Sequence, residues 1–197
     1  MDRIRRIISE VKEYGIKNKV PIMSEDTIDT IKKIIIDNKV QSILEIGTAI
    51  GYSTICFAST SGVKKVTSIE RDENRHKIAT KNVFDSGLSN IELILDDALN
   101  TRIYDKYDMI IIDAAKSQNM RFFEKYKENL SKSGIIIIDN LSFHGYVFNS
   151  DNIASRNLRQ MVRKIERFIK YLDNQNEFDV KYIEVGDRIG VCKKKNF

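Results

Sequence analysis

The sequence predicts a doubly wound α/β fold, in which helices on both faces cover a mostly parallel sheet of about seven strands. Short β-branched runs alternate with amphipathic segments, which is the pattern of repeated strand–helix–strand units. The runs around Ile110 and Ile135 are apolar on both faces, as is typical of central strands. Two closely spaced runs near the C-terminus, separated at Gly186 and Asp187, predict an antiparallel edge hairpin.

Two helices are expected before the first strand. Apolar residues recur at helical spacing within 3–14, where Gly15 is a plausible stop, and Ser24 is the expected N-cap of the second helix. The apolar stripe of the first helix consists of Ile4, Ile7, Ile8 and Val11. The expected strands cover 42–46, 65–69, 91–95, 107–112, 135–138, 179–185 and 189–193. The helices expected between them cover 53–60, 72–86, 119–130 (with Gly134 just beyond its end) and 154–172.

A single domain over 1–197, with a helical cap over 1–37, is the simplest interpretation of the length and of the absence of linkers and repeats. No apolar run is long enough to cross a membrane, and the N-terminus does not resemble a signal peptide. Cys56 and Cys192 are isolated in the sequence, so we expect small core thiols in a reducing compartment, the cytoplasm. The net charge of +5 permits an anionic partner such as RNA without requiring one.

A glycine-containing loop follows the first expected strand, from Glu45 to Ser53. Gly47 lets the chain turn sharply and lets a ligand approach, Gly51 permits close packing of strand and helix, and Ser53 can cap the next helix. The spacing E-x-G-x-x-x-G differs from the dinucleotide fingerprint, so a pyrophosphate site is not predicted. A plain turn is the other interpretation of two glycines. Glu70, about twenty residues further on, is placed to accept hydrogen bonds from both ribose hydroxyls, or is simply solvated. A ribose without a pyrophosphate indicates an adenosine derivative.

Polar side chains also follow two central strands. Asp113 ends one expected strand, and Asp139 and Asn140 follow the next parallel strand. If those strands are neighbours, the carboxylates lie at the same edge of the sheet, where ligands bind, and repel each other unless a cation lies between them. An all-oxygen donor set suits a hard divalent ion such as Mg²⁺, although Asp and Asn are also common at the start of loops. Lys116 is either a base near this site or an ordinary surface lysine.

The segments ILEIGTAIGYS and VTSIER resemble the first two motifs of class I S-adenosylmethionine (SAM)-dependent methyltransferases, and DxxK followed by DN resembles the metal-dependent O-methyltransferases of the catechol type. This resemblance covers nearly the whole chain from Ile22 onward, and it implies a Rossmann-like methyltransferase sheet and SAM as cofactor. It assigns Glu45 to the methionine amino end and Glu70 to the ribose, although Asp96 stands where many relatives have glycine. The implied cofactor-binding residues are Met23, Glu45, Gly47, Thr48, Gly51, Ser53, Glu70, Arg71, Asp97, Ala98 and Asp113.

The same resemblance implies a mechanism. Asp113, Asp139 and Asn140 are the expected ligands of Mg²⁺ or another hard divalent ion, and Asp113 and Lys116 are the expected catalytic residues. A substrate hydroxyl beside a second oxygen chelates the metal, which lowers the pKa of that hydroxyl. Lys116 takes the proton, and the oxyanion attacks the methyl group of SAM in line.

DAAKSQNMRFFEKY followed by IIIIDNLSFHG is most similar to the bacterial branch that methylates 5-hydroxyuridine at the tRNA wobble position, giving 5-methoxyuridine. Phe143, His144 and Tyr146 are expected to wall the pocket or to stack on a base. The candidate RNA contacts, which are otherwise ordinary solvated charges, are Arg3, Arg5, Arg6, Arg156, Arg159, Arg163, Lys164 and Arg167. The alternatives are a small-molecule catechol or phenol O-methyltransferase and, more remotely, a non-catalytic RNA-binding protein. A homodimer with both N-terminal helices at its interface is also expected, from the apolar stripe and the resemblance.

Overall fold

The computed structural model of the chain describes residues 2–147 and 153–195, and the chain divides into two compact units, 1–103 and 104–197. The first unit contains α1 (Asp2–Lys17), α2 (Glu25–Asp37), β1 (Ser42–Ile46), α3 (Tyr52–Ala58), β2 (Lys65–Glu70), α4 (Glu73–Ser86) and β3 (Ile91–Leu95). The second contains β4 (Tyr107–Ile112), α5 (Asn119–Tyr126), β5 (Leu130–Ile138), α6 (Arg156–Asn174), β6 (Phe178–Ile183) and β7 (Ile189–Lys194), with two short 3₁₀ helices, η1 (Lys116–Gln118) and η2 (Lys127–Asn129).

The strands form a seven-stranded sheet in the order β3-β2-β1-β4-β5-β7-β6. In the first unit, β1 and β3 pair with β2 in parallel; in the second, β4 and β5 are parallel, whereas β7 is antiparallel to both β5 and β6. The predicted fold class, including the antiparallel C-terminal strands, is therefore confirmed. The prediction of one domain with a helical cap over 1–37 stays a prediction, although α1 and α2 are both present.

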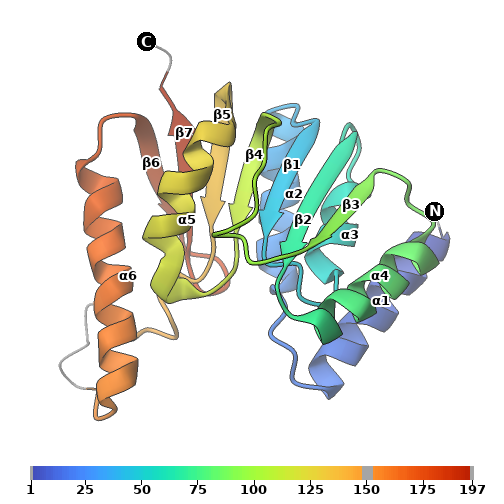
Figure 1. The fold of residues 1–197 in the computed structure, drawn as a ribbon, viewed down its shortest axis with the longest axis horizontal. Coiled ribbons are helices and arrows are strands. Elements are labelled where there is room, and N and C mark those ends of the chain that lie inside the picture. Colours follow the sequence, from blue (N-terminus) through green and yellow to red (C-terminus); the bar gives the residue numbers. More distant parts are fainter. Residues whose placement is uncertain (1, 148–152, 196–197) are drawn as a thin grey trace. The chain divides into compact units, whose positions relative to one another are not determined.

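In the first unit, helix α1 lies along α4 and also contacts α3, and α4 packs on β2 and β3 (Figure 1). The helix predicted over 72–86 is present as α4, in which Asp72 is the N-cap residue and Gly87 ends the helix in a left-handed conformation. Ser24 likewise caps α2 by accepting a hydrogen bond from the Thr27 amide. The predicted stop at Gly15 is wrong, because α1 continues to Lys17.

Gly15 has a packing role instead. A Cβ at this position would lie 2.9 Å from Cδ1 of Ile22. The glycine therefore allows the chain after α1 to pass close to the helix. A glycine inside a helix lowers helix stability only modestly.

In the second unit, α6 lies beside α5 and contacts η1 (Figure 1). The core of this unit includes the rings of Phe123, Phe168 and Phe178, which meet edge to face. The predicted helix over 119–130 is too long, because the chain passes through η2 and enters β5 at Leu130. Gly134 is therefore inside a strand; a Cβ there would lie 2.5 Å from the Leu130 side chain, so the glycine leaves room for that leucine.

Both cysteines, Cys56 and Cys192, are buried and unpaired. Among the described residues, helices that combine the length and the hydropathy needed to span a membrane are absent.

Candidate active site

The glycine loop after β1 is held by backbone hydrogen bonds and by three left-handed residues. The amides of Gly47 and Thr48 donate to the Ile69 carbonyl at the end of β2. Gly47, Ala49 and Gly51 have φ angles of 108°, 48° and 85°. Glycine adopts such angles without strain, whereas Ala49 has a conformation that costs free energy and is typical of functional loops. The loop is therefore a preformed turn.

Glu45, on β1, is fully buried and accepts hydrogen bonds from three hydroxyl groups. Ser53 Oγ donates to Glu45 Oε1 at 2.5 Å, Ser68 Oγ donates to Oε2 at 2.6 Å, and Thr54 Oγ1 also donates to Oε2. Because Ser68 has a single hydroxyl proton, its 2.6 Å contact with Thr48 Oγ1 must be a donation from Thr48. We call Glu45, Thr48, Ser53, Thr54 and Ser68 the hydroxyl network.

The hydroxyl network bears on two expectations, of which it overturns the first and leaves the second untested. Ser53 does not cap α3, because Gly51 is the N-cap residue and makes no side-chain hydrogen bond, while the Ser53 hydroxyl is directed to Glu45. Glu45 was expected to bind the methionine amino end of SAM. Its carboxylate joins β1 to the first turn of α3 and to β2 through charge-assisted hydrogen bonds. Contact of Glu45 with the cofactor stays a prediction.

Glu70, at the end of β2, is almost fully buried. Its Oε2 accepts from the Ala49 amide at 2.8 Å, and its Oε1 accepts from the Asp72 amide at 2.9 Å. Glu70 therefore fixes the glycine loop against the start of α4. Each carboxylate oxygen can accept a second hydrogen bond, so these two contacts leave capacity for the two ribose hydroxyls.

The remaining residues that were predicted to bind the cofactor differ in burial and in their hydrogen bonds. Asp97 Oδ1 accepts from the Leu99 amide at 2.8 Å, Ala98 is buried, and Asp96 Oδ2 accepts from the Thr101 hydroxyl at 2.9 Å. The Asp at position 96 thus closes the turn after β3. Met23 is buried just before α2, and Arg71 is exposed.

In the second unit, the acidic cluster consists of Asp113, Lys116, Asp139 and Asn140. Lys116, in η1, forms an ion pair with Asp113 across 2.5 Å between Nζ and Oδ1. Asn140 Nδ2 lies 3.4 Å from the same Oδ1, and the Asn140 amide donates to Asp139 Oδ1 at 2.7 Å. The structure therefore brings together all four residues that the sequence predicted, because β4 and β5 are parallel neighbours.

The single lysine of the acidic cluster only partly balances the negative charge of its two carboxylates. Asp139 is 4% exposed, and its pKa is raised to about 7 by burial and by the nearby Asp113 carboxylate, against the opposing effect of Lys116. Lys116 is an ammonium ion paired with Asp113, so it must lose a proton before it can act as a base.

The donor set of the acidic cluster fits a hard divalent cation. Two carboxylates and one side-chain amide provide oxygen ligands of the kind that Mg²⁺ prefers, and a cation would relieve the repulsion that raises the pKa of Asp139. Over residues 2–147 and 153–195, a group of three His, Cys, Asp or Glu side chains placed to hold a metal is not found. A metal here would therefore need the Asn140 amide and oxygens from solvent or substrate.

The segment 140–147, which follows Asp139, carries the predicted aromatic residues in a strained backbone. Asn140, Phe143 and His144 have φ angles of 62°, 46° and 56°. The Phe143 and His144 rings lie 5.2 Å apart between centroids, and both His144 and Tyr146 are exposed. Asp187, in the turn between β6 and β7, accepts from the His144 amide at 2.8 Å. Sequence reasoning missed Asp187, because nothing in a Gly-Asp turn signals a contact with a loop about forty residues earlier.

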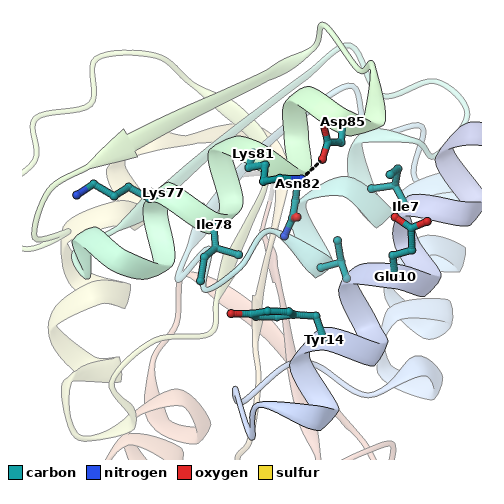
Figure 2. Close-up of a pocket in the computed structure, with 9 residues that line it drawn as sticks. Ile7, Glu10, Tyr14, Lys77, Ile78, Lys81, Asn82 and Asp85 are labelled. Carbon is teal, nitrogen blue, oxygen red and sulfur yellow. Dashed lines mark hydrogen bonds and ion pairs between the residues drawn. The ribbon is translucent and has the colours of Figure 1, made fainter.

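A further pocket of about 410 Å³ lies between α1 and α4 in the first unit (Figure 2). Ile7 and Val11, from the predicted apolar stripe, line it together with Tyr14 and Ile78. Ile7 and Val11 are buried against their own unit, so they do not form a free surface. Ile4 and Ile8 of the same stripe are half-buried, and the homodimer stays a prediction.

Comparison with known proteins gives the class of this protein. The model of the O-methyltransferase family matches residues 3–195. The chain is 39% identical, with a TM-score of 0.91, to the crystal structure of a protein provisionally named caffeoyl-CoA O-methyltransferase from Staphylococcus aureus, and the match covers 95% of this chain and 92% of that one. It is 25% identical, with a TM-score of 0.82, to an O-methyltransferase from Bacillus cereus in complex with SAH, over 96% of this chain and 91% of that one.

Among curated proteins, the catechol O-methyltransferase of Mycobacterium tuberculosis is 27% identical over 129 residues, which are 61% of this chain and 59% of that protein. The chain therefore belongs to the O-methyltransferase family, and it is a SAM-dependent O-methyltransferase of the caffeoyl-CoA and catechol type. The expectation of an enzyme that uses SAM is confirmed, and the remote alternative of a non-catalytic RNA-binding protein has no support.

Proposed function

We propose that this protein transfers the methyl group of SAM, in a Mg²⁺-dependent reaction, to a hydroxyl that has a second oxygen beside it, and that the acceptor is 5-hydroxyuridine in the tRNA anticodon. The observation that carries the metal dependence is the acidic cluster, in which two carboxylates share one lysine and Asp139 has a raised pKa. The 5-hydroxyl and the C4 carbonyl of 5-hydroxyuridine form such a pair of oxygens.

The residues of the acidic cluster have separate roles in this proposal. Asp113, Asp139 and Asn140 would hold the ion, which when bound supplies a Lewis acid that lowers the pKa of the acceptor hydroxyl. Lys116 Nζ takes the hydroxyl proton after its own ammonium form has released a proton to solvent water. The acceptor oxygen then bonds to the methyl carbon as the bond from that carbon to the sulfur of SAM breaks, giving the methyl ether and SAH.

The hydroxyl network and Glu70 bind and orient the cofactor. The two carboxylate oxygens of Glu70 that hold the loop also accept hydrogen bonds from the ribose hydroxyls. Asp97 and Ala98 border the adenine. Rigid support for the loop lowers the entropy cost of aligning the methyl group, which is the main contribution of an enzyme to such a displacement.

Phe143, His144 and Tyr146 favour a planar acceptor. These rings follow the ligands Asp139 and Asn140 in the chain, and His144 and Tyr146 are exposed. An aromatic surface stacks on a nucleobase, but it also accommodates a catechol ring. Small-molecule catechol O-methylation is therefore the second candidate function, and the names of the curated relatives favour it.

The test is mass spectrometry of nucleosides after tRNA that carries 5-hydroxyuridine has been incubated with the protein, SAM and Mg²⁺. A parallel reaction contains catechol, and a control of each contains EDTA. We expect 5-methoxyuridine that disappears with EDTA. Methylated catechol with unchanged tRNA would reassign the acceptor and keep the chemistry, whereas methoxyuridine that forms equally well in EDTA would refute the metal.

A further inference from the structure

Helix α6 has one buried face and one basic face. Its apolar side chains, Val162, Ile165, Phe168, Ile169 and Leu172, are buried in the second unit. The exposed positions between 156 and 170 carry basic or neutral polar side chains and no acid. They are Arg156, Asn157, Gln160, Arg163, Lys164, Arg167 and Lys170. At about 1.5 Å per residue, this basic face extends over roughly 21 Å.

Most cations of this face have no partner among the residues that the structure describes. Arg156, Lys164, Arg167 and Lys170 form neither an ion pair nor a side-chain hydrogen bond with another described residue. Cations three or four positions apart on a helix repel each other, as Lys164, Arg167 and Lys170 do here. This repulsion opposes formation of the helix slightly, and an anion bound along the helix would reduce it.

The arginines that were predicted to contact RNA differ in their availability. Arg159 donates through Nε and Nη2 to the Ile153 carbonyl, at 3.0 and 2.7 Å, and therefore fixes the chain before α6. On α1, Arg3 donates to the Asp85 carbonyl at 2.7 Å, and Arg6 lies 3.6 Å from Glu10. Among the described residues, Arg3, Arg6 and Arg159 therefore have protein partners, whereas Arg156, Lys164 and Arg167 do not.

The position of α6 connects this face to the acidic cluster. Helix α6 contacts η1, the 3₁₀ turn that begins with Lys116, and Lys116 pairs with Asp113. A polymer that lies along α6 therefore passes near the residues that we propose to hold the acceptor hydroxyl.

We propose that the exposed basic face of α6 (Arg156, Arg163, Lys164, Arg167 and Lys170) is a docking surface for the phosphate backbone of RNA. This inference rests on the tRNA acceptor proposed above, and it assigns the backbone contacts to one helix. A row of exposed cations without an exposed acid between 156 and 170 matches a polyphosphate chain, because phosphate contacts supply most of the sequence-independent affinity for nucleic acid. A membrane surface fits less well, because an interfacial helix inserts an apolar face and that of α6 is buried.

The experiment compares two fourfold variants with the wild-type protein. The first carries Arg156→Gln, Lys164→Gln, Arg167→Gln and Lys170→Gln. The control loses the same charge at exposed lysines elsewhere, Lys17→Gln, Lys33→Gln, Lys64→Gln and Lys132→Gln. Fluorescence anisotropy measures the affinity for an anticodon stem-loop RNA with 5-hydroxyuridine at several salt concentrations, and thermal unfolding checks that each variant is folded.

We expect the α6 variant to bind this RNA at least about tenfold more weakly and to lose about three units of slope in the plot of log affinity against log salt. The affinity of the control variant for this RNA should stay within about twofold of the wild-type affinity. Equal losses in both variants, no loss in the α6 variant, or tighter binding to phosphatidylserine vesicles than to RNA would overturn the docking surface.

The two proposals fail in different ways. If the wild-type protein binds the RNA through α6 but does not methylate it, the docking surface stands and the proposed acceptor is wrong. If it methylates the RNA, and the α6 variant does so with the same KM, the acceptor stands and the docking surface is wrong. A wild-type protein that does not bind the RNA refutes both.

Discussion

The hydroxyl network of the first unit and the acidic cluster of the second unit both place carboxylates at strand ends, but they balance the charge differently. The carboxylate of Glu45 accepts from three hydroxyl groups and joins β1 to α3 and β2. In the acidic cluster, Asp113 and Asp139 share one lysine. A carboxylate with enough donors is structural, whereas a pair with too few creates a place for a cation.

The largest effect is expected for Asp139→Ala. Loss of a proposed metal ligand should reduce kcat by about 1000-fold or more, because a Lewis acid supplies several kcal/mol of transition-state stabilisation. Calorimetry should find unchanged SAM affinity, since the hydroxyl network and Glu70 are intact. The matched control is Asp179→Asn on β6, which should behave as wild type. An equal loss of SAM affinity in Asp139→Ala would contradict the division between the two regions.

The second prediction concerns stability against pH in EDTA. The pKa of Asp139 is about 7 in the folded protein against 3.8 as the reference value, so the folded state binds more protons between these values. The contribution of Asp139 to stability should therefore be fully present below about pH 4 and be lost as the pH rises toward neutrality. Chemical denaturation across this window measures it. In Asp139→Asn this loss of stability with rising pH should be smaller. At pH 7, Mg²⁺ should restore the stability of the wild-type protein and leave that of the variant unchanged. A wild-type curve that matches the variant's curve would refute the charge imbalance.

The third prediction concerns Glu45→Gln. The substitution removes the charge and directs an amide NH₂ at groups that donate, so it should lower the free energy of unfolding by about 3 kcal/mol. Thermal or denaturant unfolding measures the loss. Glu92→Gln, on the exposed side of β3, provides the comparison and should cost less than about 1 kcal/mol. Equal costs at the two positions would mean that the network does not stabilise the loop.

The fourth prediction separates cofactor binding from metal binding. Glu70→Gln should weaken SAM binding about tenfold, because it weakens the bonds to the ribose hydroxyls and to the Ala49 amide. The concentration of Mg²⁺ that gives half-maximal methyl transfer at saturating SAM should not change. A shift in the Mg²⁺ requirement with intact SAM affinity would reverse the assigned roles.

The smallest effect is expected for Ser53→Ala, which removes one of the three donors to Glu45. We expect a loss of about 1 kcal/mol in stability, since a single hydrogen bond to a charged group is removed while two donors remain. If Ser53 instead capped α3, the variant would change amide exchange in the first turn of that helix. Exchange measured by NMR distinguishes the two, and Ser24→Ala, at a true N-cap, shows what loss of a cap does.

Periodicity and spacing predicted the elements that local sequence controls. Asp72 and Gly87 mark the ends of α4, and the runs at 42–46, 91–95 and 107–112 form strands at the predicted bounds. The predictions that Gly15 and Gly134 mark helix ends were wrong, because a glycine that ends a helix and a glycine that makes room for a neighbour are identical in a sequence.

By itself, the sequence determined the fold class, the two strand-end positions of the acidic cluster and the family, because these depend on hydrophobic patterning and on motifs with fixed spacing. Only the tertiary structure decided that Glu45 is enclosed by Ser53, Thr54 and Ser68 and that Asp187 holds the loop of His144. The physical reason is that these partners come from separate strands and turns. These hydrogen bonds form only after folding has brought the separate segments together, so a local sequence pattern does not predict them.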